Sequence, residues 1–257
     1  MTQTAALAEY LDTLLETERI PDYAGAVNGL QLSNSGTIYK IAAAVDFSSR
    51  TVAAAIEQRA NLLLVHHGMF WSGARPITGR RYQLVRSLIE NDVAVYSSHL
   101  PLDCHGIFGN NVLLSRELGL DPSGTFASHK GVPIGVRGSA TIETRILVEL
   151  SNQIASREGG KAVVTDFDPN AITRSWAICT GSGASAETLE EAAGIGVDTL
   201  IVGEGPHWTA VEANELGITI IYAGHYATET LGVRALAEHL SHHFHLGWVP
   251  IHAPTGL

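Results

Sequence analysis

The stretch NLLLVHHGMFW, residues 61–71, contains the pattern that decides the fold. Its apolar run at residues 62–65 is short and is typical of a buried strand. The run ends in His66 and His67, which Gly68 follows. In open α/β sheets, ligands bind at the carboxyl ends of the strands, so this pattern predicts a strand of an α/β fold that carries site residues at its end.

Short apolar runs and helical patterns alternate outward from this stretch. The runs expected to form strands are 41–45, 62–65, 93–97, 134–137, 162–165, 176–180, 199–202 and 219–222. The segments expected to form helices are an N-terminal amphipathic segment, 49–59, 82–91, 143–154, 186–193, 209–216 and about 227–242. Most are bounded by capping residues such as Ser, Thr, Gly and Asn. This order predicts an α/β fold with mixed, largely parallel sheets.

The segment 120–132 is rich in Pro, Gly and Ser and has no helical period, so it is expected to link two α/β units. The first predicted domain comprises residues 1–125 plus 226–257 and carries most of the candidate ligands. The second comprises residues 126–225. No short internal repeat is evident in the sequence.

Composition narrows the class of protein. The chain has 257 residues, of which 45% are hydrophobic and 16% charged, and its mean hydropathy is +0.12, which suits a compact fold. The net charge of −10 and the lack of a basic cluster argue against a nucleic-acid partner. No apolar run is long enough to cross a bilayer, and the N-terminus lacks the basic start of a secretory signal. We therefore expect a cytoplasmic protein without a membrane partner.

The cysteine content directs attention to histidine and carboxylate ligands. Cys104 and Cys179 are the two cysteines, and no C-x-x-C motif is present. This excludes a disulfide framework and thiolate zinc sites. A metal site in this chain would therefore be built from some of its 12 histidines and from carboxylates.

Three strand ends carry such residues. His66 and His67 could face one site if the backbone turns after the strand, which Gly68 permits; alternatively one is buried and the other exposed. His99 ends the next run, with Asp103 four residues later, and Pro101 is expected to prevent a regular helix between them. Asp103 could bridge two ions, or simply cap a turn.

The third strand end reads AGHYATETLG, residues 223–232. His225 and Glu229 are four residues apart at the start of a predicted helix and therefore share one face of it. Imidazole and carboxylate together suit Zn, Mn or Fe(II). Alternatively, Glu229 is an ordinary acidic residue in a first turn. From the three strand ends, His66, His67 and His225 with Asp103 and Glu229 make three histidines and two acids, a donor set suited to a two-ion site.

Other polar residues at strand ends give weaker signals. Glu204 and His207 follow the run at 199–202, and Asp46 ends the run at 41–45, so each could support a ligand or face a substrate. The loop in CTGSGASAETL, residues 179–189, could present backbone N–H groups to an anion or be a structural turn. The histidine tract HLSHHFH, residues 239–245, is expected to be a solvated helix end.

Seven motifs in this order resemble the Nif-three-like dinuclear metal centre proteins, which carry the name GTP cyclohydrolase 1 type 2 homologues. They are YAGAVNGLQ at 23–31, HHGMFW at 66–71, SHLPLD at 98–103, GNN at 109–111, AICTGSG at 177–183, VGE at 202–204 and AGHYATETLGVRALAEHL at 223–240. The resemblance extends along nearly the full chain.

The resemblance implies two similar α/β units and a toroidal homohexamer. It implies that His66, His67, Asp103, His225 and Glu229 hold a pair of divalent ions. Because these donors are imidazole and carboxylate without thiolate, Zn, Fe, Mn and Ni are the candidate metals. His99 matches the motif without a ligand role implied for it. The inserted domain of longer family members is absent from this sequence.

These expectations lead to a function hypothesis with rivals. We expect a metal-dependent hydrolase that acts on a nucleotide or another phosphate-bearing small molecule, at a ring C–N bond or a phosphoester, with Glu204 or His99 as proton carrier. A non-catalytic ring that binds metal or scaffolds a partner is the alternative. A ring that encircles nucleic acid is a weaker third hypothesis, because the chain is acidic.

Overall fold

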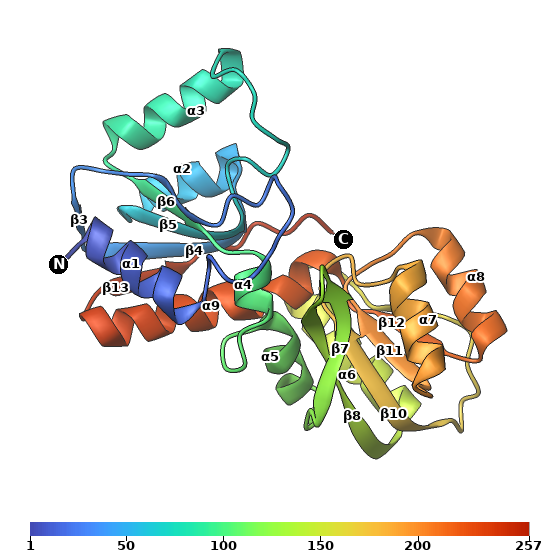
Figure 1. Ribbon diagram of the computed structural model, residues 1–257. Helices are drawn as coiled ribbons and strands as arrows, with labels where there is room; N and C mark the ends of the chain where they lie inside the picture. Colours follow the sequence, from blue (N-terminus) through green and yellow to red (C-terminus); the bar gives the residue numbers. More distant parts are fainter. Residues whose placement is uncertain (257) are drawn as a thin grey trace. The chain divides into compact units, whose positions relative to one another are not determined.

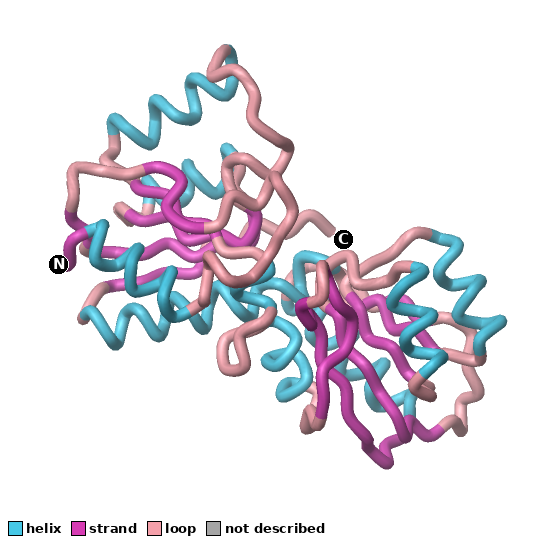
Figure 2. Tube along the Cα trace, viewed as in Figure 1, coloured by secondary structure: helices cyan, strands magenta, loops and turns pink. Residues whose placement is uncertain are grey.

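The computed structural model describes residues 1–256, which form two compact units (Figure 1). Unit 1 comprises Met1–His105 and Gly232–Ala253, and unit 2 comprises Gly106–Leu231 and the chain end from Pro254. Each unit is built around its own sheet, with helices between the strands (Figure 2). The expected α/β class with two similar, mixed sheets is therefore confirmed.

The sheet of unit 1 has five strands in the order β13-β4-β5-β6-β2. They are β13 (Gly247–Pro250), β4 (Lys40–Asp46), β5 (Leu62–His67), β6 (Ala94–Ser97) and β2 (Gly29–Leu32). The first four are parallel, and β2 pairs antiparallel with β6 at the edge. A separate antiparallel ribbon joins β1 (Thr2–Gln3) to β3 (Thr37–Ile38). These four parallel strands thus bring their carboxyl ends to one edge of the sheet.

Helices cover both faces of this sheet. They are α1 (Thr4–Leu14), α2 (Ser49–Glu57), α3 (Gly79–Glu90) and the part of α9 (His225–Phe244) from Gly232 on, with the single turn α4 (Leu100–Asp103) after β6. Helices α2 and α3 lie over one face, and α1 and α9 over the other (Figure 1). Val52 of α2 and Leu88 of α3 pack with Ala42, Leu63 and Val95 of the strands. Burial of such apolar side chains is the main force that fixes the helices on the sheet.

The sheet of unit 2 has six strands in the order β7-β8-β10-β11-β12-β9. They are β7 (Gly124–His129), β8 (Val132–Glu143), β10 (Ile172–Cys179), β11 (Thr199–Val202), β12 (Thr219–Tyr222) and β9 (Val163–Val164). Only the pairs β10–β11 and β11–β12 are parallel among these described strands. This unit therefore departs from the largely parallel pairing expected from the sequence.

Two helices cover each face of the second sheet. They are α5 (Asn110–Glu117) and α6 (Thr144–Arg157) on one face, and α7 (Ala186–Gly194) and α8 (His207–Leu216) on the other. Successive residues of β10 point to opposite faces: Trp176 and Ile178 pack with α5 and α6, whereas Ala177 packs with α7 and α8. An apolar run that is buried on both faces is the pattern from which these strands were predicted.

The two units share a strand–helix–strand repeat that the sequence alone did not reveal. In unit 1, Ser48 caps α2 through a capping box with Thr51, whose hydroxyl also donates to the carbonyl of Asp46. In unit 2, Ser185 caps α7 through the same box with Thr188, whose hydroxyl donates to the carbonyl of Gly183. The same spacing then leads from Ser48 to His67 and from Ser185 to Glu204. His67, the last residue of β5, and Glu204, two residues beyond β11, therefore occupy equivalent positions.

Two expectations from the sequence were wrong in detail. The segment 120–132 is no structureless link, because it contains β7, which pairs with β8 in a hairpin. The predicted domains also placed residues 106–125 and 226–231 in the first domain, whereas both segments cluster with unit 2, in which α5 packs against β8 and β10. A hairpin that reads as Gly- and Ser-rich turn sequence lacks the apolar alternation from which strands are recognised.

The region around Pro101 also differs from expectation. Leu100–Asp103 form one helical turn, with Pro101 in the first turn of this short helix. At that position the missing N–H of proline is not needed for an intrahelical bond, so proline is tolerated. The turn places Asp103 close to the end of β6.

Among residues 1–256, no helix is long and apolar enough to span a membrane.

Candidate metal centre

Three histidines come together at the strand ends of unit 1. His66 and His67 end β5, and His99 follows β6 by two residues. One ring nitrogen from each lies within 4.8 Å of the others, a spacing that could hold a metal ion. The three side chains are at least nine-tenths buried. The hypothesis that His66 and His67 face one site is thus supported, and the alternative with one exposed histidine is not.

The Nδ1 atom of each of these rings is held by an oxygen. His66 Nδ1 lies 2.8 Å from the carbonyl oxygen of Ser98, and His67 Nδ1 lies 2.9 Å from Asp46 Oδ1. His99 Nδ1 lies 2.9 Å from Asp22 Oδ1. A carbonyl or carboxylate oxygen only accepts, so each Nδ1 donates its proton. In the neutral ring, the lone pair is then on Nε2, as metal-binding histidines require.

Asp103 joins this group through the short helix α4. Its Oδ2 lies 3.5 Å from His66 Nε2, and the residue is buried. His99 supplies the backbone carbonyl to which the amide of Asp103 donates, so the turn fixes the carboxylate relative to the histidines. A buried carboxylate beside imidazole nitrogens is a donor set for a divalent cation.

Asp22 organises the surroundings of His99. Its carboxylate accepts hydrogen bonds from the backbone amides of Tyr23 and Leu100 and from Asn28 Nδ2, besides the His99 ring. Burial tends to raise the pKa of Asp22, but the hydrogen bonds and the charge of His99 lower it below its usual value. Asp22 therefore stays ionised and keeps the His99 ring in one orientation.

Gly68 has a role different from the one expected. A side chain at Gly68 would meet the amide group of Gln31, and the φ angle of Gly68 is not in the left-handed region. Gln31 Oε1 accepts from the backbone amide of Met69, and its Nε2 donates to the carbonyls of Ala26 and Val27. Glycine is needed here for the close approach of Gln31, which ties the segment after β5 to the 22–31 segment.

The candidate residues of unit 2 also lie close to one another. His225 Nδ1 lies 2.7 Å from Glu204 Oε1, and His225 Nε2 lies 3.0 Å from Glu229 Oε2. Ser182 Oγ donates to Glu204 Oε1 at 3.1 Å. Glu229 is only 3% exposed, whereas the Glu204 side chain is 38% exposed. His225 thus repeats the arrangement of unit 1, with Nδ1 held by a carboxylate.

The electrostatics of His225 follow from its two carboxylate neighbours. Burial alone would lower the pKa of His225, but Glu229 and Glu204 raise it to about 9. A cation is therefore strongly favoured between these carboxylates. The same electrostatic preference applies to a divalent ion, which would take the place of the proton on Nε2.

Glycines make room for this group. A side chain at Gly181 would meet Glu229 Oε1, and Gly181 has a φ of +62°. A side chain at Gly203 would meet the carbonyl oxygen of Gly181 at 2.5 Å. The backbone amide of Gly181 donates to the hydroxyl of Thr228. The glycine-rich loop after β10 therefore packs closely against the Glu229 side chain. This favours the expectation that the loop is a structural turn over the expectation that it binds an anion.

The remaining candidates lie outside these groups. His207 is exposed at the first residue of α8, and no contact with Glu204 or His225 is found among the described residues. His242, His243 and His245 are exposed at the end of α9, as expected for a solvated helix end.

Burial raises the pKa of Cys104 to about 12, with Asp103 and Asp22 adding to the shift, so this thiol stays protonated.

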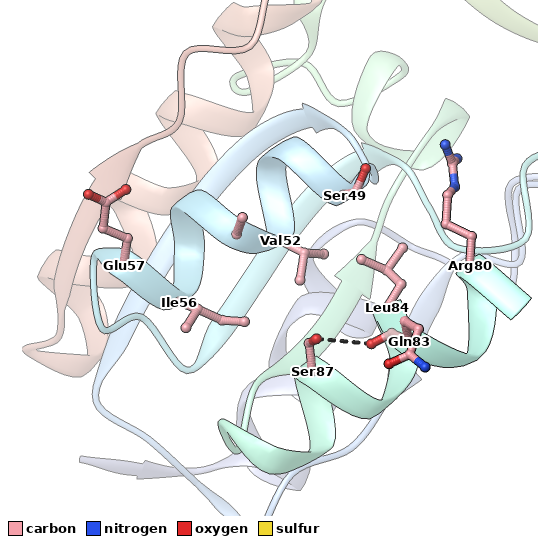
Figure 3. Close-up of a pocket in the computed structure, with 9 residues that line it drawn as sticks. Ser49, Val52, Ile56, Glu57, Arg80, Gln83, Leu84 and Ser87 are labelled. Carbon is pink, nitrogen blue, oxygen red and sulfur yellow. Dashed lines mark hydrogen bonds between the residues drawn. The ribbon is translucent and has the colours of Figure 1, made fainter.

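A separate groove of about 450 Å³ runs between α2 and α3 (Figure 3). Its wall is mostly apolar, with Val52, Ile56 and Leu84 at its centre, and Ser87 donates to the backbone of Gln83. None of the candidate ligands lines it. Its lining includes Glu57 and Arg80 but no histidine, so the groove is distinct from the candidate metal ligands.

The sequence thus indicates the candidate ligands more readily than the oxygen acceptors that orient their rings. The structure brings His66, His67, His99 and Asp103 together in unit 1 and His225, Glu229 and Glu204 together in unit 2. Asp22 and the carbonyl of Ser98 were not singled out. Asp22 directly precedes the YAGAVNGLQ motif, and that position was its only sequence signal.

Comparisons with known proteins are consistent along the whole chain. The family model Duf34/NIF3 (NGG1p interacting factor 3) matches residues 2–253. A protein of Deinococcus radiodurans named GTP cyclohydrolase 1 type 2 homolog is 39% identical over 251 residues, covering 98% of this chain and 93% of that protein. A protein of the same name from Halobacterium salinarum is 42% identical over 223 residues, covering 85% and 87%.

Solved structures agree with this match. A structure described as protein ybgI, of unknown function, superposes with a TM-score of 0.88 at 33% identity and covers 100% of both chains. A protein of Thermus thermophilus, TTHA1606, superposes with a TM-score of 0.82 at 32% identity, also over 100% of both chains. The similarity therefore includes both units.

Proposed function

Since this chain belongs to the Duf34/NIF3 family, we propose that it binds a pair of divalent metal ions through His66, His67, Asp103, His225 and Glu229 and acts as a metal-dependent hydrolase. These five residues are the ones that the resemblance implied from the sequence. Four of the five side chains are buried. The relatives' shared name, GTP cyclohydrolase 1 type 2 homolog, supports hydrolysis as the class of reaction to test.

One observation carries the proposal. His66, His67 and His225 each have Nδ1 held by an oxygen acceptor, so that each could offer Nε2 to a metal. Such outer contacts fix the tautomer and the ring orientation of metal-binding histidines. If these histidines had purely structural roles, there would be no reason for all three to have the same ring nitrogen, Nδ1, held by an oxygen. The repetition of one pattern at separate strand ends therefore supports metal binding.

The donor set limits the metal and the chemistry. Imidazole and carboxylate without thiolate suit Zn, Fe, Mn or Ni. Bound divalent ions would supply Lewis-acid activation of water and polarise the bond to be cleaved. The carboxylates of Asp103 and Glu229 would balance the positive charge, and the buried surroundings would keep bulk water away from the ligands.

His99 and Glu204 have different proposed roles. His99 lies within the histidine group and is oriented by Asp22, which supports a role in moving a proton at its Nε2 atom. Glu204 was also a candidate proton carrier, but its contact with His225 Nδ1 supports a positioning role instead. The proposed substrate is a nucleotide or another phosphate-bearing small molecule, and the proposed assembly is a homohexamer in the cytoplasm.

Metal content is the test of this proposal. Tag-free protein is reconstituted with Zn, Mn or Fe, desalted and measured by elemental mass spectrometry, in parallel with Asp103→Asn and Glu229→Gln. We expect about two ions per chain in the native protein, and the loss of at least one ion in each variant. His242→Ala removes an exposed histidine of α9 and is the control that should keep the native content.

Native metal content in both variants would show that the ligand set is wrong. No metal in the native protein after reconstitution would remove the hydrolase hypothesis altogether. Native mass spectrometry of the same samples tests the proposed hexamer.

A second candidate function is non-catalytic metal binding. The metal-loaded protein is therefore incubated with GTP, and formate and phosphate are measured. Formate release indicates cleavage of the purine ring, and phosphate release indicates phosphoester hydrolysis. Full metal content without turnover of GTP or a panel of other nucleotides would favour the non-catalytic alternative.

A further inference from the structure

Two exposed aromatic rings stand beside the histidine group of unit 1. Trp71 is 40% exposed and Tyr23 is 53% exposed. The Trp71 ring centre lies 4.5 Å from that of His67 and 4.6 Å from that of His99. The Tyr23 ring centre lies 5.9 Å from that of His99. Both rings are therefore open to solvent beside the histidine group.

The two rings form a corner. Their centres are 6.4 Å apart, and their planes are inclined by 74°. A planar ligand that stacks on the indole of Trp71 would thus meet Tyr23 at its edge. Offset stacking and edge-to-face contact are the two favourable arrangements of aromatic rings.

The backbone holds this corner in place. Gly25 allows the segment of Tyr23 to approach that of Trp71, since a side chain at Gly25 would meet the carbonyl oxygen of Trp71 at 2.6 Å. Gln31 bridges the same two segments through Met69 on one side and Ala26 on the other. Two loops that are far apart in the sequence are thereby fixed to each other with their aromatic rings exposed. Such preorganisation lowers the entropic cost of binding a ligand.

We propose that Trp71 and Tyr23 form a stacking platform for a planar nitrogen heterocycle of the nucleobase class, next to the histidine group. The chemistry that follows binding rests on the proposed function, whereas the stacking itself does not require metal. A base on Trp71 lies one ring away from His67 and His99, so the platform would place the heterocycle at the candidate centre. The platform therefore selects a nucleobase-bearing compound over an aliphatic phosphoester.

The test is equilibrium binding of three probes by isothermal titration calorimetry. The probes are GTP, guanosine and inorganic triphosphate, titrated into the full-length protein before and after metal reconstitution. Guanosine contains the planar ring, triphosphate contains only the charges, and GTP contains both. Metal content and native mass are measured for each variant, so that loss of metal or of assembly is seen directly.

Trp71→Leu should weaken guanosine and GTP binding at least tenfold, about 1.4 kcal/mol, and leave triphosphate binding unchanged. Trp71→Phe retains an aromatic face and should lose only a few-fold. Tyr23→Leu should lose about threefold, because an edge contact is smaller than a stacked one. Tyr82→Leu alters a similarly exposed tyrosine on α3, 49% exposed, and should bind as the native protein does.

Two results would overturn the platform. The first is undetectable guanosine binding by the native protein at the solubility limit. The second is equal guanosine affinity for the native protein and Trp71→Leu. If the native mass of Trp71→Leu is also altered in the second case, the corner is a contact between copies of the chain. A native protein that binds guanosine but never retains metal would disprove the proposed function and leave the platform standing.

Discussion

The two units place different residues on the same scaffold. In each, a strand leads through a Ser–Thr capping box to a helix and then to a second strand. The equivalent positions after the caps are His67, the last residue of β5, in unit 1 and Glu204, two residues beyond β11, in unit 2. His67 is buried and is held at Nδ1 by Asp46. Glu204 is partly exposed and itself holds the Nδ1 of His225. Equivalent positions thus supply a candidate ligand in one unit and its support in the other.

This difference separates what the fold determines from what the individual residue determines. The repeat brings polar side chains to strand ends in both units, where parallel strands present them at one edge of a sheet. Whether a histidine is suited to bind a metal through Nε2 depends on the oxygen that accepts a hydrogen bond from its Nδ1. In unit 1 these oxygens belong to the carboxylates of Asp46 and Asp22 and the carbonyl of Ser98, and in unit 2 to Glu204. Orientation of the imidazole is therefore the common element of the two groups.

The largest effect in this comparison is expected from the supporting carboxylates. Asp46→Asn and Glu204→Gln each replace a carboxylate that is a little more than one-third exposed, 37% and 38%, and that holds one candidate ligand. Loss of such a contact should weaken metal binding by roughly 10–100-fold. Competition titration with a chelator measures the affinity of each variant.

We expect the two variants to be affected to a similar extent, because their contacts with the histidines are of similar length, 2.9 and 2.7 Å. Asp92→Asn changes an exposed-loop contact with Ser35 and serves as the control with native affinity. A large loss in one variant and none in the other would break the equivalence of the two supports.

The sequence allowed prediction of most of this scaffold. The strand ends near His66, His99 and His225 could be recognised because apolar runs stop there and metal-type side chains follow. β7 could not, since its run of small and polar residues resembles a loop. The repeat was also hidden, because it is conveyed by spacing and two capping boxes rather than by similar side chains.

The supports of the site were hard to predict for a different reason. Asp22 reaches His99 across 77 positions of the chain, and the carbonyl of Ser98 carries no sequence signal at all. Periodicity and motif spacing describe neighbours along the chain, whereas these contacts depend on tertiary packing. Asp46 was noted as a strand-end residue because it directly terminates a predicted strand, and its contact with His67 is made across adjacent parallel strands.

A smaller effect, on stability rather than on affinity, is expected at Asp22. Asp22→Asn should lower the free energy of unfolding by about 2 kcal/mol, because the buried carboxylate accepts from charged or strongly polar donors that an amide satisfies only in part. Chemical denaturation of the metal-free protein measures this change. Glu90→Gln alters an exposed pair with Arg86 and should change stability by less than about 0.5 kcal/mol.

The pH dependence of this effect has a definite sign. The folded-state pKa of Asp22 is lowered, so its contribution is fully present above the unfolded pKa of about 3.9 and is lost as the pH falls through the folded value. Native and Asp22→Asn protein should therefore differ most near neutral pH and converge in acid. A difference that grows in acid would show that the carboxylate is not stabilised by its partners in the folded protein.

The smallest expected effect tests whether the two repeats are energetically equivalent. Ser48→Ala and Ser185→Ala each remove one capping side chain, with hydroxyl-to-amide distances of 3.2 Å in both boxes. Each should lower the free energy of unfolding by about 1 kcal/mol. Ser87→Ala on α3 removes a hydroxyl that donates within its own helix and should be nearly neutral, which makes it the matched control.

Because the boxes are alike but the residues at the equivalent positions after them differ, equal losses of stability with unchanged metal affinity would show that the scaffold is independent of the ligands it carries. A loss of metal affinity in Ser48→Ala alone would show instead that the cap of α2, through Thr51 and the carbonyl of Asp46, helps to position the support of His67.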